Sequence, residues 1–540
     1  MIEPENPEGN IEYKLLLKDD SDEKIQCLTS QMRYRLNESE NGECFYQLGV
    51  HDNGEVIGIT EEEYNKTINI LTKAADNNNY YITLLTTTDV TDEKKIYEVL
   101  FREKHENKYI DIKCCVAGNV DGGKSSLIGH LISGKNDDGR GLTRSYVFNF
   151  LHEIKTGRTS SVAHHILGFN TKGDIVNTQS VNKFSWQEIV ERSVKIISFI
   201  DLCGHSRYLR TTISGLASSF PDVCIIMISA NAETIHINTK EHILLCITLK
   251  IPFIIVVSKI DICKDRKNVL DQTVVSINKM LKHPIVRRFP VHIKSMDDIL
   301  LTIKNIYTLS IVPIFYTSCV TGQGMDNLKM FFNLIGKNPE NFKKKSDENI
   351  VEFHVDHLFY VQGFGTVVGG YLISGDIKIG DKLLLGPNMD SYEPIFIKTI
   401  YCKKIPLQKV SFGEYVCLGI KKTDIKIKKG NVILSSNNPQ LIVKTFTANI
   451  NVLKTHSTTV KVGYEPLLSA HSIRQVVKIT DIKDKQNLKN SLNNDDKILR
   501  NGDVATVTFK FKYCSQFLKI GTRFILAEGT TKITGEVLTN

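Results

Sequence analysis

A glycine-rich run in the first third of the chain has residue types and spacing that suit phosphate binding. The sequence GNVDGGKS fits the pattern GxxxxGK[ST] and lies between an apolar run, DIKCCVAG, and a helix-like stretch. The backbone N–H groups of such a loop and the N-terminus of the helix form a cradle for phosphate oxygens. We expect Lys124 to reach the β- and γ-phosphates of a nucleotide and Ser125 to be a ligand of Mg²⁺. The residues expected to contact nucleotide here are Gly118, Asn119, Val120, Asp121, Gly122, Gly123, Lys124, Ser125 and Ser126.

A second short motif, DLCG, ends the apolar run VKIISFI. The carboxylate of Asp201 can hold the water shell of a magnesium ion, and the N–H of Gly204 can sense the γ-phosphate. Alone the motif is weak, because an aspartate at a strand end is usually a loop residue. Its place one strand after the phosphate-binding loop makes it informative.

A third motif, SKID, ends the run PFIIVVS and suggests which base is bound. Asp261 can accept hydrogen bonds from N1 and the exocyclic amine of guanine, two donors that adenine does not present in that arrangement. A site of this kind rejects the mismatched ligand by roughly 10⁴-fold. Ser258 begins the motif, and the stem of Lys259 is expected to pack along the base. The tripeptide Ser318, Cys319 and Val320 closes the last strand, where a backbone N–H would meet guanine O6.

These motifs must be held together by an α/β domain. From residue 111 to about 336, near-continuous apolar runs alternate with helical stretches, as in a parallel sheet covered on both faces. We predict a nucleotide-binding domain over residues 108–338 and a charged linker over 339–350.

Different patterns precede and follow this domain. Residues 1–107 predict a small α+β domain in the order βαββαβ, similar to a split βαβ unit, with a hairpin at Asp52-Asn53-Gly54. Thr60 and Glu63 form a capping box that opens its second helix. Short strands with glycine-rich turns predict two β-barrels, over 351–440 and 441–540.

The composition of the chain indicates its possible partners and its cellular compartment. The 540 residues carry a net charge of +8, which is compatible with RNA or ribosome contact without demonstrating it. The 12 cysteines show no metal-ligand spacing and suggest a reducing compartment. The polar N-terminus resembles no targeting signal, and the apolar runs are shorter than the ~20 residues of a membrane helix. We therefore expect a cytoplasmic, non-membrane protein that is a monomer.

The chain resembles the translational GTPases of the elongation factor Tu and 1-alpha superfamily, and most of all their GTP-binding protein 1 and 2 branch. The resemblance spans residues 9–540, and the stretch over 138–161 is its most diagnostic part. The matching segments are GNIEYK, GNVDGGKSSLIGHL, GRGLTRSYVFNFLHEIKTGRTSS, ILGFN, FIDLCGH, SKID, GTVVGG and GYEPLLSAHS.

This resemblance implies roles that spacing alone does not supply. Thr159 matches the switch threonine that joins the Mg²⁺ shell, and His205 matches the histidine that positions the attacking water. Asp121 matches a carboxylate used near the phosphates. The chain departs from the superfamily at Ser258, where an asparagine is usual, at Gly122 in place of histidine, and at Arg158 in place of a hydrophobic gate residue.

The resemblance implies a magnesium-dependent GTPase whose barrels respond to GTP or GDP. Its expected partners are the ribosome, tRNA or the mRNA-decay machinery. Two alternatives remain open at this point. The chain could use GTP as a regulatory ligand with negligible turnover, or it could be an elongation-factor-like subunit of a metabolic complex, as in sulfate adenylyltransferase.

Overall fold

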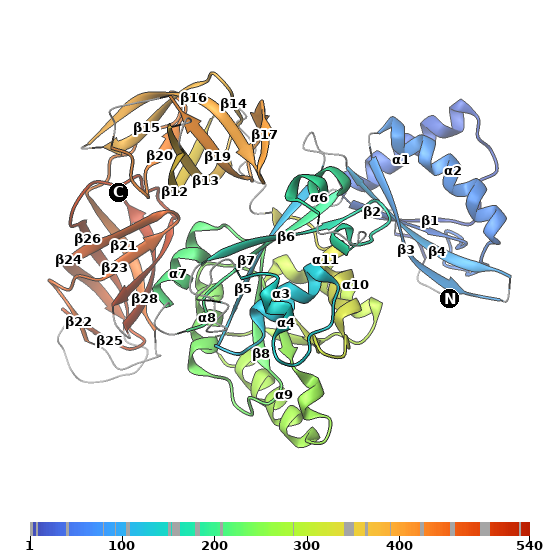
Figure 1. Ribbon diagram of the computed structural model, residues 1–540, viewed down its shortest axis with the longest axis horizontal. Helices are drawn as coiled ribbons and strands as arrows, with labels where there is room; N and C mark the ends of the chain where they lie inside the picture. The colour runs from blue at the N-terminus through green and yellow to red at the C-terminus, as the bar shows by residue number, and fades with distance from the viewer. Residues whose placement is uncertain are drawn as a thin grey trace. The chain divides into compact units, whose positions relative to one another are not determined.

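The computed structural model describes most of the chain (Figure 1). The described residues are 4–6, 9–38, 43–78, 80–91, 93–103, 109–148, 153, 162–178, 184–205, 209–284, 286–339, 350–361, 365–388, 390–421, 426–453, 459–486, 497–528 and 531–540. They form a small α+β domain, an α/β domain and two β-barrels, which confirms the expected architecture. The exact domain boundaries stay predictions. Within these ranges, no helix is long and apolar enough to span a membrane.

The N-terminal domain places two helices against a four-stranded sheet of order β1-β2-β4-β3. Thr60 and Glu63 form the expected capping box at the start of the second helix. Buried side chains of β2 and β4 share one hydrophobic core with those of both helices. The elements are β1 (Ile11–Lys14), α1 (Asp22–Asn37), β2 (Glu43–Leu48), α2 (Glu61–Asn77), β3 (Tyr80–Asp89) and β4 (Lys95–Glu103).

The expected split βαβ arrangement of this domain is wrong in one respect. The parallel strands β1 and β2 pair directly with each other, so no third strand separates them. The expected turn is present, because His51 N donates to Glu55 O at 2.9 Å and Gly54 has φ 81°. The chain after it makes only isolated bridges, at Val56 and Ile59, because the capping box starts α2 at once.

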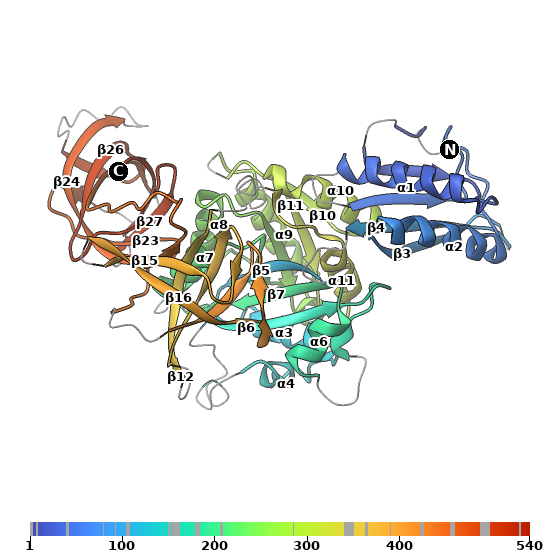
Figure 2. The ribbon, with the colours of Figure 1, turned by 90° about the horizontal axis from the view of Figure 1, so that it is seen from above.

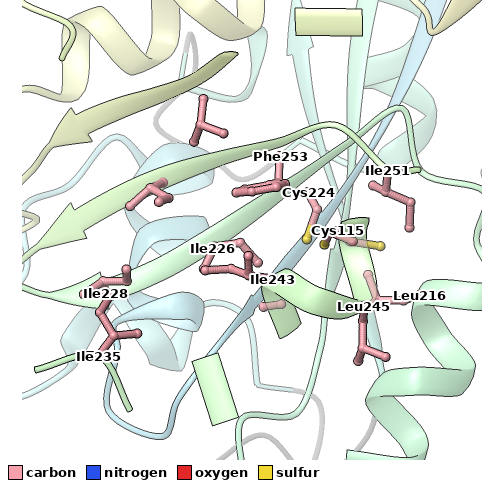
Figure 3. Packing of buried hydrophobic residues seen from close by; sticks show 14 of the residues in the cluster. Cys115, Leu216, Cys224, Ile226, Ile228, Ile235, Ile243, Leu245, Ile251 and Phe253 are labelled. Atoms are coloured by element: carbon pink, nitrogen blue, oxygen red, sulfur yellow. The ribbon is translucent and has the colours of Figure 1, made fainter. Parts of the chain in front are cut away.

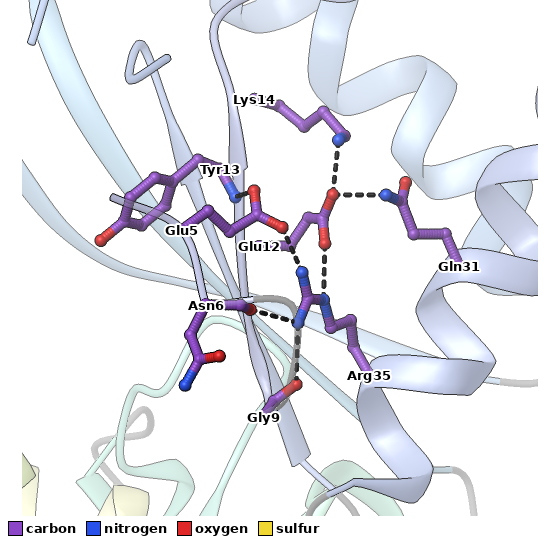
Figure 4. A network of polar contacts seen from close by, with 8 residues as sticks. All are labelled: Glu5, Asn6, Gly9, Glu12, Tyr13, Lys14, Gln31 and Arg35. Atoms are coloured by element: carbon purple, nitrogen blue, oxygen red, sulfur yellow. Dashed lines mark hydrogen bonds and ion pairs between the residues drawn. The ribbon is translucent and has the colours of Figure 1, made fainter. Parts of the chain in front are cut away.

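A buried polar network joins the start of the chain to α1 (Figure 4). Glu12 on β1 is 1% exposed and accepts a hydrogen bond from Arg35 Nε at 2.6 Å. The same guanidinium contacts the carboxylate of Glu5 and donates to the carbonyls of Asn6 and Gly9 at 2.8 and 3.2 Å. The Arg35 guanidinium offsets part of the desolvation cost of the buried Glu12 carboxylate.

The central domain is built on a seven-stranded sheet of order β10-β11-β9-β8-β5-β7-β6. The neighbours from β10 to β5 are parallel. Its strands are β5 (Ile110–Gly118), β6 (Ala163–Phe169), β7 (Lys195–Asp201), β8 (Val223–Ser229), β9 (Phe253–Ser258), β10 (Phe289–His292) and β11 (Ile311–Tyr316). Its α-helices are α3 (Lys124–Ser133), α4 (Leu142–Ser145), α6 (Trp186–Arg192), α7 (Leu209–Ser218), α8 (Ile237–Thr248), α9 (Lys267–Leu281), α10 (Met296–Asn305) and α11 (Met325–Leu334), with short 3-10 helices at Val176–Thr178, Ile260–Cys263 and Ile306–Thr308.

Both faces of this sheet are covered by helices. On one face, Cys115 and Cys224 of neighbouring strands pack in a buried cluster with Leu216 of α7 and Ile243 of α8 (Figure 3). On the other, the ring of Phe331 in α11 lies 5.3 Å from that of Phe315, which alternates with the first face along β11. Figure 2 likewise shows α8 and α9 on one side and α3 on the other. This double cover explains the near-continuous apolar strands.

Two six-stranded barrels follow, the first closed by the pairing of β15 with β16 and the second by β21 with β28. The first contains β12 (Glu352–Val361), β13 (Gly365–Ser374), β15 (Lys382–Asn388), β16 (Ser391–Cys402), β19 (Tyr415–Ile420) and β20 (Val432–Leu434), with β17 (Ile405–Leu407) paired to β16 and a separate pair β14 (Ile377–Lys378) and β18 (Lys409–Val410). The second contains β21 (Thr445–Val452), β23 (Leu467–Ala470), β24 (Ile473–Gln486), β26 (Val504–Phe511), β27 (Arg523–Glu528) and β28 (Thr531–Thr539), with a separate pair β22 (Thr459–Lys461) and β25 (Ile498–Arg500).

Candidate nucleotide-binding site

Four strands of the central sheet end at the segments that carry the sequence motifs. The phosphate-binding loop follows β5, the DLCG motif follows β7, the SKID motif follows β9 and the segment from Ser318 follows β11. The carboxyl ends of parallel strands meet at one edge of a sheet, where open α/β sheets bind ligands. The topology therefore gathers segments that are far apart in the sequence.

The phosphate-binding loop adopts a conformation that requires glycine at two positions. Gly118 has φ 144°, and a Cβ there would lie 2.6 Å from the carbonyl oxygen of Met227 on β8. Gly123 has φ 85° and is the N-cap of α3. Between them Asp121 also has a positive φ, 59°, which aspartate tolerates better than most residues. The loop therefore presents its backbone N–H groups at the start of α3.

Lys124 lies buried inside this loop. Its Nζ donates to the carbonyls of Gly118 and Asn119 at 3.3 and 2.9 Å. Burial lowers the pKa of Lys124, and the carboxylates of Asp201 and Asp121 partly oppose that effect. A buried ammonium held by two carbonyls can turn to phosphate oxygens when they are present.

The DLCG motif lies directly against this ammonium. A Cβ added to Gly204 would overlap Lys124 Nζ and would lie 2.9 Å from the carbonyl oxygen of Gly118. One residue cluster therefore holds the lysine and the glycine backbone that were predicted to face the γ-phosphate. Nearby, Ser125 Oγ donates to Asp201 Oδ2 at 2.7 Å, and both side chains are buried.

Ser258, the first residue of the SKID motif, is bonded to the phosphate-binding loop. Its Oγ donates to the carbonyl of Gly122 at 2.8 Å, and the side chain is 3% exposed. Its hydroxyl also lies 3.4 Å from the place where a Cβ on Gly123 would sit. A hydroxyl at this position thus joins the base motif to the loop, a role that the sequence did not reveal.

The two base motifs are joined by one hydrogen bond. Ser318 Oγ donates to Asp261 Oδ1 at 2.5 Å and accepts from the backbone N–H groups of Val320 and Thr321 at 3.2 and 3.1 Å. This arrangement orients the carboxylate beside a tight turn of backbone amides. Lys259 precedes it with φ 61° and is half-buried. The segment Ser318-Cys319-Val320 is therefore placed beside the carboxylate expected to recognise the base.

Of Thr159 and His205, whose roles come from the resemblance, the structure describes only His205. Thr159 and the neighbouring Arg158 lie outside the described residues. His205 is described, is half-buried, and follows Gly204 directly. His205 is therefore the next residue after Gly204, whose backbone lies against the Lys124 ammonium. Ser126 lies in the first turn of α3.

Two residues of α8 near the loop were missed from the sequence. Asn238 Nδ2 donates to Asn119 Oδ1 at 3.4 Å. His242 is buried, and burial followed by the charge of Lys124 lowers its pKa to about 3, so it stays neutral at physiological pH. No motif marks either residue, because their proximity depends on how α8 packs across the sheet.

The chain is similar in sequence to known GTP-binding proteins and similar in fold to a translation elongation factor. The elongation factor Tu GTP-binding domain matches residues 111–358. GTP-binding protein 2 of Homo sapiens is 37% identical over 547 residues, covering 99% of this chain and 88% of that protein. GTP-binding protein 1 of Xenopus laevis is 36% identical over 539 residues, covering 98% and 79%. The structure of translation elongation factor SelB from Methanococcus maripaludis, in complex with the GTP analogue GppNHp, has a similar fold, with a TM-score of 0.52 and 18% identity over 80% of each chain.

Proposed function

The chain belongs to the family of GTP-binding proteins 1 and 2 within the elongation factor Tu-type GTPases, and on this premise we propose that it hydrolyses GTP as a magnesium-dependent translational switch. The observation that carries the proposal is the cluster of Lys124, Gly204 and the Ser125–Asp201 pair at one edge of the sheet. Buried cations and backbone amides around a triphosphate are what phosphoryl transfer requires.

The residues present fit a magnesium ion. A serine hydroxyl and a carboxylate 2.7 Å apart supply the hard oxygen donors that Mg²⁺ prefers. Ser125 would ligate the ion and Asp201 would hold its water shell, with Thr159 completing the set by family resemblance. When bound, the ion would offset negative charge on the β- and γ-phosphates.

Residues of the chain would bind the phosphates and the base and would orient the attacking water. Lys124 would leave the carbonyls of Gly118 and Asn119 and bind the β- and γ-phosphates. Gly204 N–H would contact the γ-phosphate, and His205 would orient a water molecule in line with the bond that breaks. Asp261, Lys259 and Cys319 would bind guanine.

Loss of the γ-phosphate would release the segments that follow Gly204 and that contain Thr159. We propose that the two barrels respond to this change and thereby alter the binding of a ribosome, a tRNA or the mRNA-decay machinery in the cytoplasm. The protein is proposed to act as a monomer.

The test is single-turnover hydrolysis of GTP with and without ribosomes and tRNA. We expect ribosomes to stimulate the wild-type protein. The His205→Ala variant should bind GTP normally and lose about 10²-fold or more of the stimulated rate, since water positioning of this kind contributes 10²–10⁴-fold. The Lys124→Ala variant should lose tight binding and serves as the control for nucleotide occupancy.

Normal stimulated hydrolysis by His205→Ala would contradict the role of that histidine. A wild-type protein that binds GTP but is not stimulated by ribosomes would contradict the translational switch and favour a GTP-binding regulatory module.

A further inference from the structure

The loop between α3 and α4 contains an aspartate whose bonds reach the base-recognition segment. The side chain of Asp137 accepts from both the N–H and the Oγ1 of Thr143, each at 2.8 Å, and from Gly141 N at 3.2 Å. These bonds close the loop on itself. The backbone N–H of Asp137 then donates outward, to the carbonyl of Cys319 at 2.8 Å.

The accepting carbonyl belongs to the turn that would meet guanine O6. Residues 318–323 form this turn, with Gly322 N donating to Ser318 O at 2.9 Å. Burial, followed by the carboxylates of Asp137 and Asp261, raises the pKa of the Cys319 thiol to about 12. The Cys319 thiol is therefore close enough to both the loop aspartate and the carboxylate proposed to recognise the base to be affected by their charges.

The other end of the loop is anchored on the helix of the phosphate-binding loop. Thr143 is fully buried, and its backbone carbonyl packs so closely on α3 that a Cβ at Gly129 would overlap it. Because α3 begins at Lys124, one short chain of contacts runs from the phosphate site through Thr143 and Asp137 to Cys319.

We infer that Asp137 is a positioning residue for guanine recognition: through Thr143 and Cys319 it sets the backbone amides of residues 318–320 against O6 of the base. This inference rests on the proposed guanine-nucleotide site and names the residue that tunes its selectivity. Its bonds reach the base through the backbone, so its removal affects contact with O6 more than contact with the phosphates.

The chain offers two matched variants. In Asp137→Asn the amide oxygen still accepts from both groups of Thr143, but the amide NH2 replaces the oxygen that accepts from Gly141 N, so positioning should survive in part. Asp138 is the neighbouring residue, and its Oδ1 accepts from Arg140 N and Leu142 N at 2.8 and 3.1 Å, within the same loop. No hydrogen bond described for Asp138 reaches residues 318–323, so Asp138→Ala disturbs the loop without the link to the base segment.

The experiment measures dissociation constants for GDP and for the diphosphate of 2-aminopurine riboside, which keeps the 2-amino group and lacks both O6 and the N1 proton. We expect Asp137→Ala to weaken GDP binding by about 3- to 10-fold, the value of one neutral hydrogen bond, and to leave the analogue unaffected. Asp138→Ala should bind both nucleotides as the wild-type protein does, and Asp137→Asn should bind GDP more tightly than Asp137→Ala does.

An equal loss for both nucleotides, or no loss for GDP, in Asp137→Ala would overturn the inference. So would an Asp137→Asn protein that is folded by thermal unfolding and binds GDP no better than Asp137→Ala does. The proposed function fails separately, if the wild-type protein does not prefer GDP to ADP.

Discussion

At the residue scale, Ser258 shows what a serine side chain contributes at the first position of the SKID motif. The sequence identified this serine as a departure from the asparagine that the superfamily usually has at this position. The structure shows that the Ser258 hydroxyl donates to the carbonyl of Gly122 at 2.8 Å. The connection between the base motif and the phosphate-binding loop is therefore made by a hydroxyl.

The prediction at the residue scale concerns the role of Asp261 in guanine selectivity. Asp261→Asn should lower affinity for GDP by about 10²- to 10⁴-fold, because the new amide presents a donor to the two donors of guanine. Xanthosine diphosphate, which has a carbonyl in place of the exocyclic amine, should bind the variant better than GDP does. Competition between labelled GDP and xanthosine diphosphate measures the change.

The matched control for this experiment is Asp265→Asn, an exposed aspartate four residues along the same segment. It should keep the wild-type preference. Unchanged guanine selectivity in Asp261→Asn would remove the carboxylate from base recognition, and the proposed site would need another specificity residue.

At the scale of elements, the close approach of α4 to α3 depends on a glycine. Any side chain at Gly129 would overlap the carbonyl of the buried Thr143, and it could be accommodated only by moving α4 away. Since α3 begins at Lys124, the same movement would disturb the phosphate-binding loop.

We therefore expect Gly129→Ala to destabilise the protein by about 1–3 kcal/mol, as overpacking of a well-filled site does, although alanine has the higher helix propensity. GTP affinity should fall several-fold. Thermal unfolding and nucleotide titration measure the two effects. Ser133→Ala, near the end of the same helix, should change neither, and a Gly129→Ala protein as stable as wild type would show that α4 is not held against α3.

At the scale of the whole molecule, contacts join the central domain and the barrels. The ring of Phe220, two residues after α7, lies 4.7 Å from that of His471 in the second barrel and 5.9 Å from that of Tyr371 in the first. Glu352 of the first barrel accepts from Lys519 of the second at 2.5 Å and contacts His354 Nε2 at 2.8 Å. The Phe220 contacts connect both barrels to the segment that follows α7, and the contact of Glu352 with Lys519 connects the barrels to each other.

Glu352 makes the contact between the two barrels dependent on pH. Burial alone raises its pKa, but the hydrogen bond and charge of His354 and the charge of Lys519 outweigh burial and hold the pKa well below 4.5. A carboxylate whose pKa is depressed in the folded state stabilises that state fully above its unfolded pKa, and the contribution is lost as pH falls below it.

Glu352→Gln should therefore lower the free energy of unfolding by about 1–3 kcal/mol at pH 7. The difference from wild type should shrink as pH falls below about 4.5. Urea unfolding at several pH values measures it. Glu465→Gln removes an exposed pair with Lys512 and should have little effect at any pH; a difference at Glu352 that does not shrink in acid would contradict the assignment.

Some parts of the fold could be predicted from the sequence and others could not. Capping and strand periodicity are local properties, so the capping box at Thr60 and the alternation of helices with apolar strands were correctly predicted. The pairing of β1 directly with β2 was not, because it depends on which strand edges meet after the chain has collapsed. The same limit left Asn238 and His242 unnoticed beside the phosphate-binding loop.

The sequence by itself determined the motifs, their order and the class of ligand, because a glycine-rich loop before a helix and a carboxylate after a strand act through local backbone geometry. Only the tertiary structure decided which side chains meet. Ser125 and Asp201 are 76 positions apart, Ser258 and Gly122 are 136 apart, and each pair is joined only because parallel strands end at one edge. Contacts that follow from strand order and helix packing cannot be read from spacing along the chain.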